Sequence, residues 1–184
     1  HTYAFLSDST VIHLTKLYSD VIFIAMKKKG ILISLEGGEG SGKSTQAVRL
    51  KTYFEKRGYN VRILQEPGET RIGKKIRGVL LNPEHLEISA ITEVLLYMAS
   101  RAQLVEEIIK PSLAKGQIII CDRYIDSSMA YQGCGRGLGL KTVGLLNDIA
   151  IQGNKPDITF YFDLNPAIGL KRKYKSTQGK MDRK

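Results

Sequence analysis

Eight consecutive residues, 37–44, read Gly-Gly-Glu-Gly-Ser-Gly-Lys-Ser and match the pattern of a phosphate-binding loop. An apolar stretch at residues 31–35 precedes the loop, and a segment of helical period follows it. In this context the glycines let successive backbone N–H groups face one anion, and Lys43 brings a positive charge to the terminal phosphates. Ser44 is suited to hold Mg²⁺ through its hydroxyl. The loop therefore predicts that a nucleoside triphosphate binds, but it does not say which reaction follows.

Two further polar clusters come directly after apolar stretches. Residues 66–70 read Glu-Pro-Gly-Glu-Thr, and Asp122-Arg123-Tyr124 follows a later stretch. In an open parallel sheet both clusters would lie at the carboxyl ends of strands, where ligands bind. Asp122 is placed to hold Mg²⁺ directly or through water, and Arg123 to bridge phosphate oxygens with its planar fork. The alternative is a surface turn with a local Asp–Arg pair. Because no Asp-x-x-Gly switch follows this stretch, as a GTPase would show, the pattern favours a small-molecule kinase.

Tyr97 and Arg101 are four residues apart in a predicted helix and so share one face. An aromatic ring offers a stacking surface and a guanidinium offers donors to carbonyl oxygens, so the pair could grip a planar base. A core tyrosine beside a solvated arginine is the other interpretation, and the spacing alone leaves both open.

The chain has 184 residues, which is room for one domain with a full core. Cys121 and Cys134 form neither a zinc pattern nor a disulfide framework, which favours the reducing cytoplasm. The net charge of +10 is uneven, because residues 171–184 carry +6 and residues 27–29 carry +3. The basic tail is either a solvated surface or an arm that contacts phosphates.

Residues 1–25 lack the features of a signal peptide, and the apolar run at 21–26 is far shorter than the roughly 20 residues that cross a bilayer. We therefore predict no membrane association. Because Met26 and three lysines resemble an ordinary start, we interpret residues 1–25 as an upstream or non-native extension and 26–184 as the functional domain.

Short apolar runs alternate with segments of helical period, which predicts an α/β fold with a parallel sheet flanked by helices on both faces. The expected strands are residues 31–36, 61–65, 117–121 and 158–164. The expected helices are residues 43–57, 71–81, 89–110, which Pro111 should end, and 140–152.

Five motifs in this order resemble the thymidylate kinase family: residues 36–45, 66–68, 95–101, 122–133 and 156–159. The resemblance runs from about residue 30 to 183. It implies a P-loop kinase fold and transfer of the ATP γ-phosphoryl group to dTMP with Mg²⁺, giving dTDP and ADP. It also implies a homodimer and no specific nucleic-acid partner.

The resemblance assigns roles to individual residues. It implies that Lys43, Glu66, Asp122 and Arg123 take part in the chemistry and that Ser44 and Asp122 hold the metal. The implied ATP contacts are Gly37, Gly40, Ser41, Gly42, Lys43, Ser44 and Thr45. For dTMP it implies that Glu39 approaches the 3′-hydroxyl, that Arg77 joins Arg123 at the phosphate, and that Tyr97 and Arg101 hold thymine. Ser128 and Gln132 would read the base edge, and Tyr131 would pack where a ribose 2′-hydroxyl would clash.

Gly40 stands where one branch of the family has an arginine, so the chain resembles the lid-bearing bacterial branch. The lid would span about residues 166–184, with Arg172, Lys173, Lys175 and Arg183 as candidate cations. Two departures are Gln65 and Glu69, which replace an arginine and a glycine beside the Glu-Pro-Gly motif. Tyr97 also replaces the more usual phenylalanine.

Family members continue past the lid with a further strand and helices, whereas this sequence stops at Lys184. We expect the final strand and helices to be missing, the fourth or a neighbouring strand to have an unpaired edge, and stability to be reduced. Whether this form is active stays open. Two alternatives remain: a deoxynucleoside kinase with Glu66 or Asp122 as base, and a nucleotide- or nucleic-acid-binding module without chemistry.

Overall fold

A five-stranded parallel sheet lies at the centre of the protein, in the order β1-β5-β2-β4-β3. The computed structural model describes residues 2–6 and 30–181, with side chains described from residue 30 to 174. The strands are β1 (Thr2–Leu6), β2 (Ile31–Gly37), β3 (Val61–Gln65), β4 (Ile118–Asp122) and β5 (Ile158–Phe162).

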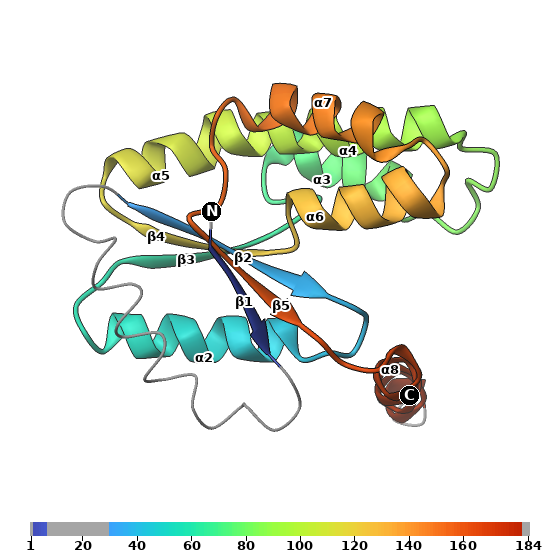
Figure 1. Cartoon of the computed structure of the whole chain (residues 1–184). Coiled ribbons are helices and arrows are strands. Elements are labelled where there is room, and N and C mark those ends of the chain that lie inside the picture. Colours follow the sequence, from blue (N-terminus) through green and yellow to red (C-terminus); the bar gives the residue numbers. More distant parts are fainter. Residues whose placement is uncertain (1, 7–29, 182–184) are drawn as a thin grey trace.

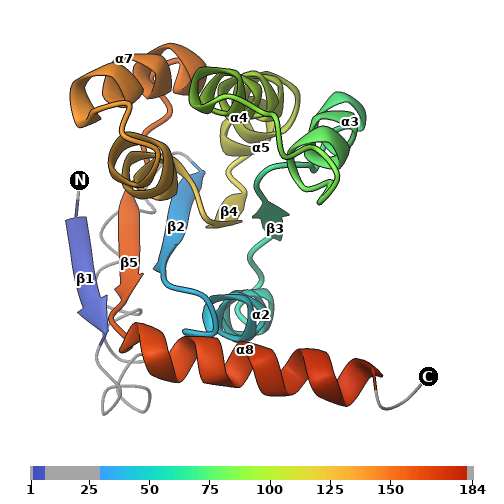
Figure 2. The same ribbon diagram turned by 90° about the vertical axis from the view of Figure 1, so that its right-hand side faces the viewer.

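Helices cover both faces of this sheet (Figure 1). One face carries α2 (Lys43–Glu55), and the other carries α3 (Arg71–Leu80), α4 (Ala90–Leu104), α5 (Lys110–Ala114), α6 (Ile125–Ser128) and α7 (Leu140–Ile151). Two π-helical segments, Val105–Ile109 and Met129–Gly135, follow α4 and α6. The last helix, α8 (Pro166–Met181), runs crosswise beyond the carboxyl ends of the central strands, next to α2 (Figure 2).

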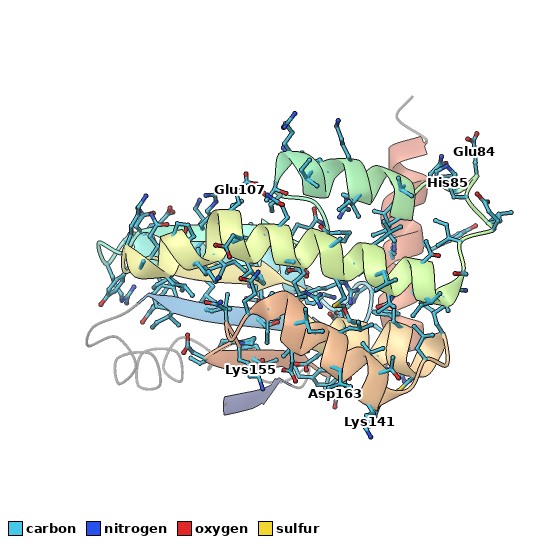
Figure 3. The ribbon with its side chains drawn as sticks, turned by 90° about the horizontal axis from the view of Figure 1, so that it is seen from above. Glu84, His85, Glu107, Lys141, Lys155 and Asp163 are labelled. Carbon is cyan, nitrogen blue, oxygen red and sulfur yellow. The ribbon has the colours of Figure 1, made fainter. Side chains whose placement is uncertain are left out.

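Two apolar clusters fill the space between sheet and helices. On the α2 side, Leu50 and Phe54 pack on β2 and β5, and on the other side Leu104 and Ile109 pack on β2 and β4. Because β2 and β4 are buried on both faces, their sequences are continuous apolar runs. Charged side chains such as Glu107, Lys141 and Lys155 lie on the outer surface (Figure 3).

The predicted α/β class and parallel sheet are confirmed, and β3 spans the predicted residues. The other three predicted strands differ by at most two residues at an end. The prediction that Pro111 ends its helix is wrong, since the helical path continues through the π-helical segment into α5. Pro111 lies in the first turn of α5, where the missing N–H breaks no bond within that helix.

For the fourth predicted strand, β5, the prediction of an unpaired edge is also wrong. β1 pairs with that edge in parallel register, from Thr2 opposite Ile158 to Leu6 opposite Phe162. The segment Thr-Tyr-Ala-Phe-Leu is rich in residues that favour strands, so it can satisfy the free backbone groups of β5. The interpretation of residues 1–25 as an extension is not tested by this pairing, and residues 7–29 lie outside the described part.

Removing residues 1–6 should destabilise the protein, because the outer edge of β5 would lose its partner strand. A net backbone hydrogen bond contributes about 1 kcal/mol, and ordering entropy offsets part of the sum. We expect a melting midpoint lower by roughly 2–8 °C, measured by circular dichroism. A variant with residues 2–6 replaced by alternating glycine and serine keeps the chain length and should melt like the deletion. Unchanged midpoints in both variants would show that β1 contributes nothing.

Candidate active site

The phosphate-binding loop connects the end of β2 to the start of α2, as the sequence predicts. Gly40 and Gly42 adopt φ angles of 68° and 97°, in the left-handed region that glycine enters without strain. No side chain caps the first turn of α2. The N–H groups of that turn therefore remain available to an anion beside the loop.

Lys43 is folded over the loop. Its Nζ donates to the carbonyl oxygens of Gly37 at 2.9 Å and Gly38 at 2.7 Å, with Ser41 Oγ at 3.4 Å. Burial lowers the pKa of Lys43, and the charge of Arg123 adds to the effect. A phosphate would replace these carbonyl contacts with a stronger, charge-assisted partner.

Ser44 and Asp122 meet at the mouth of the loop, where Ser44 Oγ donates to Asp122 Oδ2 at 2.5 Å. One hydroxyl and one carboxylate are the hard oxygen ligands that Mg²⁺ prefers when phosphates complete its shell. Among the described residues no group of three or more acidic, histidine or cysteine side chains could hold a metal without a substrate. The pair thus fits a magnesium ion that arrives with a nucleotide.

Arg123 contacts both the phosphate loop and the segment that follows β4. Its φ angle of 74° is unusual for a residue with a side chain. The guanidinium donates to Gly37 O and Ser127 Oγ, both at 3.2 Å, and to Glu39 Oε1 at 2.6 Å. It also lies 5.3 Å from the centre of the Tyr131 ring. Arg123 was predicted to contact a phosphate, and in the structure its side chain lies at the phosphate loop.

Arg101 is buried and occupies all of its donors within the protein. Nε donates to Glu66 Oε2 at 2.7 Å, and Nη2 contacts the same oxygen at 2.6 Å and Tyr124 O at 2.9 Å. Nη1 donates to Ser128 Oγ at 3.0 Å and to Asn147 Oδ1. Burial raises the pKa of Glu66, and Arg101 opposes that rise. A base oxygen would have to share or displace one of these partners to reach Arg101.

The residues predicted for dTMP share one cleft with the phosphate loop. Arg77 Nη1 donates to Pro67 O at 2.7 Å, and Gln132 Nε2 donates to Glu93 Oε1 at 2.8 Å. Tyr97 also lines this cleft, and burial raises its pKa. Ser128 and Tyr131 belong to the same lining.

Sequence reasoning missed four polar residues of the site: Glu36, Glu93, Arg136 and Asn147. Glu93 lies four residues before Tyr97 in α4, so helical spacing could have found it. Arg136 pairs with Glu93 at 3.3 Å. Asn147 comes from α7, and no local pattern marks it.

Glu36 is a buried carboxylate at the end of β2. It accepts hydrogen bonds from Ser34 Oγ at 2.9 Å, Tyr124 N at 2.7 Å and Ser127 Oγ at 2.6 Å. Burial raises its pKa, while these three donors oppose the rise. The sequence feature that could have identified Glu36 is an acidic residue at the end of an apolar strand. Glu36 holds the segment after β4 against the phosphate loop.

One cleft of about 1050 Å³ joins these groups and exceeds the size of a typical single-ligand pocket. All predicted site residues with described side chains line it except Gly37 and Ser41, which belong to the adjoining loop. Arg172 and Lys173 of α8 complete the lining. The side chain of Lys175 and all of Arg183 lie outside the described part.

Residues 154–157 read Asn-Lys-Pro-Asp and match the base-reading pattern of GTPases. The sequence alone does not exclude that these residues read a base. In the structure Asp157 Oδ2 accepts from the backbone N of Leu32 at 2.8 Å, and Asn154 Nδ2 donates to Ile151 O at 3.0 Å. These contacts lie at the amino end of β5, opposite the phosphate loop. The motif is structural here, since none of its residues lines the cleft.

Comparisons with known proteins identify the family of the chain. A family model described as thymidylate kinase matches residues 35–184. The chain is 52% identical to a thymidylate kinase of Caldanaerobacter subterraneus subsp. tengcongensis over 145 residues, which is 79% of this chain and 69% of that protein. It is 47% identical to a thymidylate kinase of Thermoanaerobacter sp. over 84% of this chain and 76% of that protein.

A crystal structure of thymidylate kinase from Ehrlichia chaffeensis superposes with a TM-score of 0.69 at 38% identity, covering 78% of this chain and 81% of that one. The family model, these sequence identities and the shared fold agree with one another. The chain therefore belongs to the thymidylate kinase family, the ATP-dependent kinases that phosphorylate dTMP.

Proposed function

We propose that the phosphate loop holds ATP and that the far end of the cleft holds dTMP, so that the γ-phosphoryl group passes between them. The observation that carries this proposal is one continuous cleft that is lined both by the phosphate loop and by Arg77, Tyr97 and Gln132. Phosphoryl transfer needs mainly positioning and charge neutralisation. Both are available at Arg123, which contacts the loop at Gly37 and Glu39 and also lies beside the Tyr131 ring.

At the ATP end, the N–H groups of the loop and the start of α2 bind phosphate oxygens. Lys43 gives up its carbonyl contacts for the terminal phosphates. Ser44 and Asp122 hold Mg²⁺, which neutralises charge on the phosphates when bound. Gly37, Gly40, Ser41, Gly42 and Thr45 shape the rest of this half.

At the dTMP end, Arg77 and Arg123 hold the acceptor phosphate with their planar forks. Tyr97 stacks on thymine, Gln132 and Ser128 face the base edge, and Tyr131 packs against the sugar. Glu39 approaches the 3′-hydroxyl. For Arg101 we propose that the Nη1 group, which donates to Ser128, also contacts a base oxygen. The other donors of Arg101 hold the surrounding segments of the protein in place.

The structure disfavours the deoxynucleoside kinase alternative. A hydroxyl acceptor needs a free carboxylate as base, yet Glu66 pairs with Arg101 and Asp122 accepts from Ser44. The alternative without chemistry is disfavoured by the family, since the relatives that the chain matches are thymidylate kinases. Arg172 and Lys173 of α8 line the cleft, so we keep α8 as a lid over it, with no specific nucleic-acid partner.

We also propose that the enzyme acts in the cytoplasm. Cys121 and Cys134 are both free thiols in the structure. Among the described helices, none combines the length and apolar character that a bilayer crossing requires.

Coupled ADP-release assays should show turnover with dTMP at least about 100-fold above that with thymidine, because Arg77 and Arg123 would be left without a phosphate. Among the three nucleotide acceptors we expect dUMP to follow dTMP and UMP to give the lowest turnover.

EDTA should abolish turnover. Lys43→Met should lower kcat by about 100-fold, whereas Lys141→Met, on the outer surface, should not. Strong turnover of thymidine with none of dTMP would reverse the assignment.

We propose a homodimer through the outer side of α4 and α7. Ile91 and Leu95 are half-exposed on α4, while Leu145 and Ile149 are exposed on α7 by 60% and 74%. Each pair is four residues apart and so forms a stripe on its helix. Contiguous exposed apolar surface of this kind marks protein interfaces.

Sedimentation should give a dimer for the unmodified protein and a monomer for Leu95→Asp, because the variant would bury a charge in an apolar interface. Leu86→Asp is the matched control, since Leu86 is 90% exposed in the loop before α4 and should leave the dimer intact. A monomeric unmodified protein, or a dimeric Leu95→Asp variant, would contradict this interface.

A further inference from the structure

Helix α8 rests on the phosphate loop through two glycines. A Cβ placed on Gly40 would lie 2.1 Å from Gly169 O, and a Cβ on Gly169 would lie 2.1 Å from Glu39 O. Neither position has room for any side chain. Gly169 is also buried, although both of its neighbours on α8 are exposed. The backbone of α8 therefore packs directly on the loop, and Gly40 has a steric role beyond its lack of charge.

This contact determines where Lys173 emerges. Residues four apart in a helix share a face, so Lys173 lies one turn beyond Gly169 on the side that faces the loop. Its Nζ donates to Glu39 Oε2 at 2.8 Å. Arg123 Nη2 donates to the other oxygen, Oε1, at 2.6 Å. The Glu39 carboxylate is thus held by two cations from two different elements.

The hydrogen bond from Lys173 is the largest of the effects that lower the pKa of Glu39, and the charges of Arg123 and Lys173 contribute further. Glu39 is therefore ionised and accepts hydrogen bonds only. The side chains of Lys173 and Glu39 are 56% and 43% exposed. An ion pair this exposed is weak enough to open and close.

We propose that Lys173 is a positioning residue that acts through Glu39: the Gly40–Gly169 contact seats α8, and Lys173 then orients the Glu39 carboxylate toward a hydroxyl of the acceptor sugar. The proposal rests on the proposed function, since it needs the acceptor nucleotide in this cleft. Lid seating and acceptor recognition are then coupled through one carboxylate. Lys173 contributes to sugar selection rather than to neutralising the transferred phosphoryl group.

The test compares dTMP with its 3′-deoxy analogue at saturating ATP, in the unmodified protein and in three variants. Lys173→Met removes the cation and Lys173→Arg keeps it. Lys171→Met removes the same charge from the same helix at a position that does not line the cleft. We measure kcat and KM for each acceptor and KM for ATP.

We expect the unmodified enzyme to prefer dTMP by about tenfold in kcat/KM, the value of one hydrogen bond. Lys173→Met should reduce that preference to below about threefold, mainly through KM for dTMP, with KM for ATP unchanged. Lys173→Arg and Lys171→Met should retain it. An equal fall of kcat with both acceptors would overturn the proposal, because Lys173 would then act on the phosphates directly. An unaltered preference in Lys173→Met would also overturn it.

A second readout needs no turnover and so separates this proposal from the proposed function. Hydrogen exchange of the α8 amides in the nucleotide-free protein should rise in Lys173→Met and in Glu39→Gln, and the double variant should rise no further than either single variant. Additive increases would overturn the coupling. If the unmodified protein fails to phosphorylate dTMP while the exchange coupling holds, the proposed function fails and the ion-pair geometry stands.

Gly169→Ala tests the seat itself. Alanine in a helix interior normally stabilises the helix relative to glycine by roughly 1 kcal/mol. If α8 did not rest on the phosphate loop, Gly169→Ala would therefore slow the hydrogen exchange of the α8 amides. We expect the opposite, with faster exchange and the reduced 3′-hydroxyl preference of Lys173→Met, because the added Cβ would collide with Glu39 O. Greater protection in Gly169→Ala would overturn the seating.

Discussion

The buried guanidinium of Arg101 is the group on which the proposed acceptor half of the cleft depends. It joins the loop after β3 through Glu66, the segment after β4 through Tyr124 and Ser128, and α7 through Asn147. A charge buried this deeply is tolerated only when it is fully paired. Because every donor is used, the four walls that meet at Arg101 are fixed relative to one another before any nucleotide binds.

The proposed ATP half differs from the proposed acceptor half, because its key groups are held by contacts that a ligand can replace. Lys43 is bonded to loop carbonyls, and Ser44 to Asp122, within the same cleft. Glu39 is held between Arg123 and Lys173 at partly exposed positions. A rigid acceptor wall thus faces a phosphate loop and lid helix whose contacts can be exchanged, which suits a reaction governed by positioning.

The sequence was sufficient for the parts that depend on local pattern. Buried strands produce continuous apolar runs, and the phosphate loop has its own glycine spacing, so β3 and the start of α2 at Lys43 were predicted correctly. Contacts between distant segments were not predictable. Neither Asn147 beside Arg101 nor Gly169 on Gly40 leaves a local signal. β1 was not predicted because residues 1–25 were interpreted as an extension. The continuation of the helical path past Pro111 was not predicted because a π-helical segment has no sequence signature that we could use.

The most direct test of this account is a double-mutant cycle on Arg101 and Glu66, read by both chemical unfolding and dTMP binding. Arg101→Met should cost about 3–5 kcal/mol of stability, since it leaves a buried carboxylate unpaired. The double variant Arg101→Met/Glu66→Leu should recover most of that stability and still bind dTMP poorly, because the walls of the acceptor half are no longer fixed. An Arg101→Met variant as stable as the unmodified protein, or a double variant that binds dTMP normally, would contradict the account.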